Sequence, residues 1–158
     1  MKKIKLLNGF VLFLILINLV FFIGNLYVSS FTEFGADLNK IDENLILGSH
    51  TRDIQSIFSF ILIFGLIFVY LGLKKVVGKG YFNADNVKVF KIAGTFFIIS
   101  GLARLSLESY LFYATQDVAH LGFMGQDLFI LLIGYGLFII ADITENGSLM
   151  QQDNELTI

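Results

Sequence analysis

The sequence predicts an all-α fold, a four-transmembrane-helix antiparallel bundle with both termini cytoplasmic. Three observations predict it: a strongly apolar composition, four long apolar segments, and lysines gathered on one side of those segments. Hydrophobic residues make up 56% of the 158-residue chain, with 18 Phe, no Pro and a mean hydropathy of +0.77. This apolar share exceeds that of ordinary soluble domains, so we expect a membrane protein.

Four segments are long enough to span a hydrocarbon core, which takes about 20 residues. Residues 6–32 and 54–73 carry no charge, and two later segments carry only isolated charges. The apolar runs are continuous and lack the alternation of membrane β-strands. The first run is too long for a secretory signal, so we expect an uncleaved helix. We predict one integral membrane domain, residues 1–158, with helices at about 7–28, 54–73, 92–113 and 123–141 and a tail over 142–158.

The basic residues set the expected orientation. Eight lysines precede the first helix or fill the connection between the second and third: Lys2, Lys3, Lys5, Lys74, Lys75, Lys79, Lys88 and Lys91. The other side holds only Lys40 and Arg52. Basic residues stay on the cytoplasmic side, so we place the loops at about 29–53 and 114–122 outside. We expect a multi-pass protein of the bacterial inner membrane, with lipid-headgroup binding or docking as the alternative role of the lysines.

An arginine and a glutamate interrupt the third apolar segment. Ser100, Arg104 and Glu108 follow one another at four-residue steps and therefore share one face of the helix. Charged side chains inside a membrane face other helices rather than lipid. Counting about 1.5 Å per residue places polar groups from all four helices in one layer of the outer half. The predicted buried polar layer consists of Asn18, Arg104, Glu108 and Asp127, with Ser56 and Ser59 at similar depth.

This layer has two interpretations. In the first, Glu108 or Asp127 neutralises Arg104 and Asn18 forms a hydrogen bond with it, which fixes the helix register. In the second, the layer is a small pocket that opens outward, where a carboxylate takes up a proton or Arg104 holds an anionic group. One arginine against two carboxylates leaves one carboxylate unmatched.

The sequence lacks the residues that several classes of function require. The absence of cysteine excludes thiolate metal sites, Cys nucleophiles and disulfide exchange. His50 and His120 show no metal-ligand spacing, and Gly134-Tyr135-Gly136 has no strand before it, so we expect no metal and no cofactor. No nucleophile-base pair is evident, and the net charge of -2 suggests no polyanionic partner. We therefore predict neither an enzyme nor a protein that binds nucleic acid directly.

Two further patterns concern packing. Glycines spaced seven residues apart, or seven residues beyond Asp127, predict close helix contacts: Gly65, Gly72, Gly94, Gly101 and Gly134. In the acidic outer loop, Leu38, Ile41 and Leu45 recur at helical spacing and predict a short amphipathic helix.

Two stretches on the expected cytoplasmic side carry a family resemblance. In GKGYFNADNVKVFKIAG, residues 78–94, Gly80, Phe82 and Asn86 match a pattern of Gly, Pro, Phe and Asn before a basic helix start. Tyr81 takes the place of the proline, which leaves this turn less rigid. The second and stronger match is the tail ADITENGSLMQQDNELTI, through Asp142, Ile143, Gly147, Asp153, Asn154, Glu155, Leu156, Thr157 and Ile158.

Through these residues the chain resembles domain of unknown function 2975 (DUF2975), a family of bacterial four-helix integral membrane proteins. The resemblance implies four membrane helices and no established activity. It also implies a regulatory pairing, because some members are encoded beside a small Cro-like helix-turn-helix regulator. Members usually carry arginines near the tail glycine, whereas Thr144, Glu145, Ser148 and Leu149 stand here, which puts an anion-binding tail in doubt.

The two stretches should lie together. We expect Asn86 to cap a helix that begins at Val87, and Phe82 to enter the interface. The tail has four carboxylates and no lysine, so it either docks on the five lysines of residues 74–91 or presents its apolar end to a partner.

We therefore expect an integral membrane protein with a regulatory or protein-interaction role that acts through its cytoplasmic loop and C-terminal tail. The alternative is a small proton- or anion-coupled transporter that uses Arg104, Glu108 and Asp127, although no broken helix or inverted repeat is evident. Expected partners are the lipid bilayer, a cytoplasmic protein such as a helix-turn-helix regulator, and further copies of the chain in a homo-oligomer.

Overall fold

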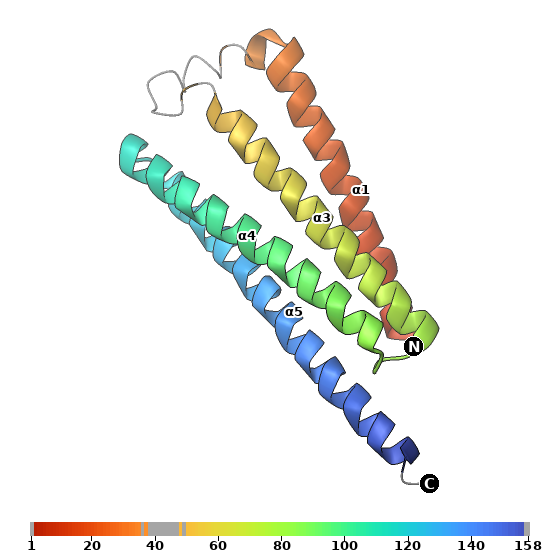
Figure 1. Cartoon of the computed structure of the whole chain (residues 1–158). Helices are drawn as coiled ribbons and strands as arrows, with labels where there is room; N and C mark the ends of the chain where they lie inside the picture. Colours follow the sequence, from red (N-terminus) through yellow and green to blue (C-terminus); the bar gives the residue numbers. More distant parts are fainter. Residues whose placement is uncertain (1, 36, 38–47, 49, 157–158) are drawn as a thin grey trace.

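The computed structural model describes residues 2–35, 37, 48 and 50–156, and their regular structure is helical. Its four long helices are α1 (Lys2–Phe31), α3 (His50–Lys79), α4 (Ala84–Thr115) and α5 (Ala119–Leu156) (Figure 1). The amphipathic helix predicted around Leu38, Ile41 and Leu45 lies outside the described residues. The same holds for Thr157 and Ile158 of the tail motif.

All four helices are long and apolar enough to cross a membrane, which confirms the all-α class and the four apolar helices. Each one contains a predicted segment and extends beyond it at both ends. The longest, α5, has 38 residues, so it measures about 57 Å at about 1.5 Å per residue. A hydrocarbon core is only about 30 Å thick, so α5 projects well beyond such a layer and includes most of the tail.

The helices pack in chain order. The α1 helix packs on α3, α3 on α4, and α4 on α5, the last pair sharing the most extensive contact. In Figure 1 the start of α1 and the end of α5 lie toward the same end of the molecule, where α3 meets α4. We call this the lysine-rich end, because the eight lysines counted above lie at or next to the helix ends that meet there.

Glycines allow the closest helix contacts. A Cβ atom at Gly94 of α4 would lie 2.9 Å from the carbonyl oxygen of Gly134 on α5. Gly65 and Gly72 of α3 accept the rings of Phe97 and Phe90 from α4 in the same way. These contacts agree with the packing role that the glycine spacing predicts. Around them lies the apolar core, made of Val76, Val87, Phe90, Ala93, Phe97, Leu137 and Ala141.

The turn between α3 and α4 corrects one prediction. Helix α4 begins at Ala84, and its cap is Asn83, whose side-chain oxygen accepts a hydrogen bond of 2.8 Å from the Asp85 backbone N–H. Asn86 is not the cap. It is fully buried in the first turn, and its Nδ2 donates to the carbonyl oxygen of Gly80 at 3.1 Å. Asn86 therefore ties the turn to α4 from inside.

Candidate functional site

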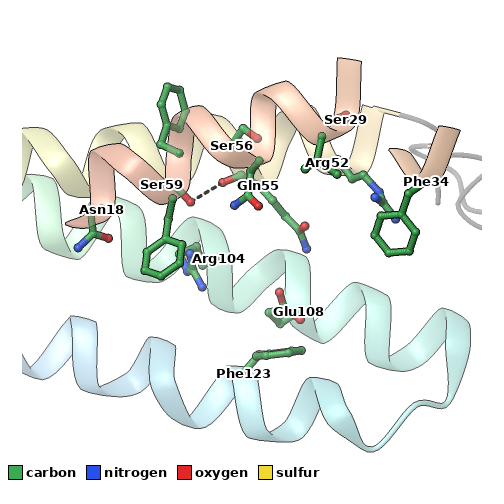
Figure 2. Close-up of a pocket in the computed structure, with 14 residues that line it drawn as sticks. Asn18, Ser29, Phe34, Arg52, Gln55, Ser56, Ser59, Arg104, Glu108 and Phe123 are labelled. Atoms are coloured by element: carbon green, nitrogen blue, oxygen red, sulfur yellow. Dashed lines mark hydrogen bonds between the residues drawn. The ribbon is translucent and has the colours of Figure 1, made fainter. Parts of the chain in front are cut away.

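A pocket with a volume of about 500 Å³ lies between the helices, away from the lysine-rich end. Residues from α1, α3, α4 and α5 border it, and Figure 2 shows their side chains converging between α1 and α3 on one side and α4 and α5 on the other. Its lining consists of Asn18, Phe21, Phe22, Asn25, Val28, Ser29, Phe34, Arg52, Gln55, Ser56, Ser59, Arg104, Glu108 and Phe123.

Arg104 is held in the pocket wall by a carboxylate from the neighbouring helix. Its Nε atom donates a hydrogen bond of 2.7 Å to Oδ1 of Asp127 on α5. Asp127 is completely buried behind the pocket, and its Oδ2 has no hydrogen-bond partner among the described residues. Of the two carboxylates considered from sequence, Asp127 is therefore the one that pairs with Arg104.

Glu108 has a partner that sequence reasoning missed. Its Oε2 lies 2.7 Å from Nδ1 of His120, in the first turn of α5. Both side chains are largely buried, at 7% and 17% exposure. The sequence places His120 in the outer loop at about 114–122. The structure places it in α5 instead, where its contact with Glu108 forms a second link between α4 and α5. The short connection after Gln116, which has a left-handed φ of 57°, brings the two side chains together.

The other polar residues of the predicted layer mostly bond within their own helices. Asn18 lines the pocket, but its Nδ2 donates to the carbonyl oxygen of Leu14 at 2.8 Å and not to Arg104. Ser59 likewise donates to the carbonyl oxygen of Gln55, as the dashed line in Figure 2 marks. Ser100 is fully buried outside the pocket lining and donates across to Phe58 of α3 at 3.2 Å. The layer therefore combines two interhelical carboxylate pairs with a wall of locally bonded polar groups.

The pocket has a polar and an aromatic side. Phe21 and Phe22 of α1 and Phe123 of α5 contribute rings, while α3 contributes amide and hydroxyl groups and the guanidinium group of Arg52. Arg104 and Glu108 both face this space from one side of α4, a single helical turn apart (Figure 2). Such a wall can bind a molecule that has both polar and apolar parts. In the described part of the chain, no group of three or more His, Asp or Glu side chains is placed to hold a metal ion.

At the lysine-rich end, the two stretches that carry the family resemblance meet. The ring of Phe82 lies directly over Gly147 of α5, so closely that a Cβ atom there would overlap it. Lys91 of α4 bonds Glu145 at 2.8 Å and approaches Asp142 at 3.5 Å. We call these five residues the docked surface. Phe82 thus enters the interface, and the first part of the tail docks on α4.

Beyond Ser148, the residues of α5 up to Asn154 are exposed. Leu149 is 53% and Met150 is 67% exposed, and residues 151–154, including Asn154, are exposed as well. Glu155 and Leu156 lie in the last turn of the helix. We call residues 149–156 the tail arm. The tail is therefore docked up to Ser148, which is 8% exposed, and its residues 149–154 are exposed.

No family model, no curated protein and no solved structure matches this chain. The resemblance to domain of unknown function 2975 therefore stays a prediction that rests on the two stretches described above.

Proposed function

We propose that the protein is a regulatory membrane protein whose lysine-rich end lies in the cytoplasm and binds a partner protein there. In this proposal the four helices cross the inner membrane in an antiparallel arrangement. One observation carries the proposal: Phe82 and Lys91 fasten the start of the tail to α4, while α5 continues beyond them to Leu156 with residues 149–154 exposed.

The charge distribution supports a cytoplasmic position for this end. The lysines cluster where α1 begins and where α3 meets α4, and lysine excess marks the cytoplasmic side of membrane proteins. The tail arm belongs to the same end, because α5 passes over the docked surface before it ends at Leu156. A cytoplasmic partner would thus meet the docked surface and the tail arm together.

Charge also indicates what kind of partner fits the tail arm. Asp153 and Glu155 are acidic, and residues 142–158 contain no lysine or arginine. Leu149 and Met150 add exposed apolar surface at the base of the arm. An acidic helix with exposed apolar side chains fits a partner with an apolar groove and a basic rim. DNA-binding regulators have basic surfaces, so a helix-turn-helix regulator matches this description, and the tail arm would compete with DNA for it.

Site-specific photo-crosslinking in living cells tests the proposal. A photo-reactive residue at Met150 should give a discrete adduct with a basic cytoplasmic protein. Replacing Asp153 and Glu155 by lysine should abolish that adduct, because it reverses the charge of the arm. The matched control is the same photo-reactive residue at Tyr113, which is 80% exposed at the opposite end. Adducts that persist unchanged after the charge reversal would contradict a partner recognised by the acidic arm.

A small proton- or anion-coupled transporter is the second candidate function. It is favoured by the two carboxylate pairs, Arg104 with Asp127 and Glu108 with His120, because ionisable groups inside a membrane mark ion and proton pathways in many transporters. Proton flux into proteoliposomes measures this function directly. Flux that depends on Glu108 would support transport, and liposomes as tight as protein-free ones would exclude it.

A further inference from the structure

The pocket at the end opposite the lysines has the size of a ligand site and takes no part in the proposed cytoplasmic function. Its volume of about 500 Å³ falls within the range of small-molecule sites, about 300–1,000 Å³. Its wall includes Glu108, which is 5% exposed overall. Buried charged groups in an apolar helix assembly are costly and usually serve a purpose.

The two charged residues that α4 contributes to the pocket, Arg104 and Glu108, have bonding capacity left toward it. Asp127 occupies Nε of Arg104, and a guanidinium group has four more N–H donors on its terminal nitrogens. His120 occupies Oε2 of Glu108, and the other carboxylate oxygen is an additional acceptor. Arg104 and Glu108 are about 6 Å apart along the helix axis. The pocket thus offers an anion-binding group and a cation-binding group one helical turn apart.

Arg52 of α3 also borders the pocket, but at the pair of Arg104 and Glu108 an ion of a single charge is disfavoured. A simple anion on Arg104 would lie near the Glu108 carboxylate, and a simple cation on Glu108 would lie near the guanidinium group, so each meets repulsion. We propose that the pocket binds a zwitterion, with a phosphate or carboxylate group on Arg104 and an ammonium group on Glu108. The rings of Phe22 and Phe123 line the same space and suit an ammonium group or a carbon chain.

Two sources can supply this chemistry: the ethanolamine headgroup of a membrane lipid, and a free zwitterion from outside the cell. Both have an anionic group joined to an ammonium group by a short carbon bridge. Binding in nanodiscs of defined lipid composition distinguishes the two.

Calorimetric titration of the purified full chain in detergent tests the proposal, with O-phosphoethanolamine as the probe. Inorganic phosphate and ethanolamine are the matched half-ligands. O-phosphoethanolamine should bind saturably and at least about tenfold more tightly than either half, because it gains a second charge-assisted hydrogen bond. No saturable binding, or equal binding of inorganic phosphate, would overturn the proposal.

Two variants connect the binding to this pocket. Glu108→Gln keeps the size of the side chain and should weaken O-phosphoethanolamine binding about tenfold, with no loss for inorganic phosphate. Ser56→Phe should fill the pocket and abolish binding of both, whereas Ser106→Phe on the exposed face of α4 should leave it intact. Wild-type affinity in both Glu108→Gln and Ser56→Phe would place the binding elsewhere and overturn the assignment.

Nanodiscs identify the source. If phosphatidylethanolamine in the disc, but not phosphatidylglycerol, prevents O-phosphoethanolamine from binding, the lipid headgroup is the ligand. If the probe binds equally well in both discs, a free zwitterion is the ligand. Both outcomes support a zwitterion site, and absence of binding in micelles and in both discs would overturn it. Because the assay uses no cytoplasmic partner, its result is independent of the proposed regulatory function.

Discussion

The Nε atom of Arg104 on α4 lies 2.7 Å from Oδ1 of Asp127 on α5, and Asp127 has no exposed surface. This ion pair joins the two helices that share the largest contact in the molecule. It also orients Arg104 in the pocket wall, and among the described residues this is the one basic side chain that α4 contributes to the lining. The pair therefore connects the packing of the helices to the shape of the pocket.

Arg104→Gln should destabilise the protein strongly, because it leaves the buried Asp127 carboxylate without its cation. The expected loss is about 3 kcal/mol in the free energy of unfolding. The double variant Arg104→Gln/Asp127→Asn should recover most of this loss, since it removes both charges. Unfolding of the purified variants in mixed micelles measures the difference. A double variant that is less stable than the single one would contradict the pairing.

His120→Ala should lower the free energy of unfolding by about 1–3 kcal/mol, because the largely buried Glu108 side chain then loses its hydrogen-bond partner. His50→Ala is the matched control, since His50 also faces a carboxylate, Asp53, but at 3.4 Å with both side chains exposed. An exposed pair of this kind contributes little, so the control should be close to wild type. The same unfolding assay applies, and equal losses at both histidines would contradict the role of His120.

Gly134→Ala should separate α4 from α5. The added Cβ would lie 2.9 Å from a side-chain carbon of Ile98 and 3.1 Å from the Gly94 carbonyl oxygen, and such overpacking typically costs about 1–3 kcal/mol. Gly136→Ala provides the control on the same helix, because no atom lies within 4 Å of its added Cβ. Thermal unfolding midpoints should be lower for Gly134→Ala than for Gly136→Ala. Equal midpoints would mean that α4 and α5 do not meet at these residues.

Gly147→Ala should release the turn between α3 and α4, since the new Cβ would occupy the space of the Phe82 ring. Amide hydrogen exchange at Gly80, whose N–H donates to the carbonyl oxygen of Val76 at 3.1 Å, should become faster than in the wild type. When Phe82→Ala is already present, adding Gly147→Ala should change this exchange little, because the ring that the Cβ displaces is gone. Gly125→Ala is the control on α5, because no atom lies within 4 Å of its added Cβ, and it should leave the exchange in this turn unchanged. Unchanged exchange in Gly147→Ala would mean that the docked surface does not hold the turn.

The sequence predicts the four helices well, because hydrophobic length is a property of each segment by itself. The glycine contacts follow for a similar reason, since a seven-residue spacing keeps small side chains on one helix face. The need of Arg104 for a carboxylate could also be predicted. Which carboxylate it takes could not, because Glu108 lies one turn away on the same helix and Asp127 at similar depth on another.

Errors in the predicted helix boundaries explain why the roles of His120 and Asn83 were missed. The fourth helix begins at Ala119 and not near residue 123, so His120 lies in a helix opposite Glu108 and not in a loop. Likewise α4 begins at Ala84, three residues before the predicted Val87, and this moves the cap from Asn86 to Asn83. Boundaries depend on turns and caps of a few residues, where apolar periodicity carries no information.

The most direct test of the account is the side of the membrane on which each end lies, because the tail arm needs the cytoplasm and the pocket needs the outer side. The chain has no cysteine, so single cysteines can be introduced without background. In intact cells, a membrane-impermeant maleimide should label Asp117→Cys at the α4–α5 connection at once, and Met150→Cys only after permeabilisation. Labelling of Met150→Cys in intact cells, with Asp117→Cys protected, would contradict the account.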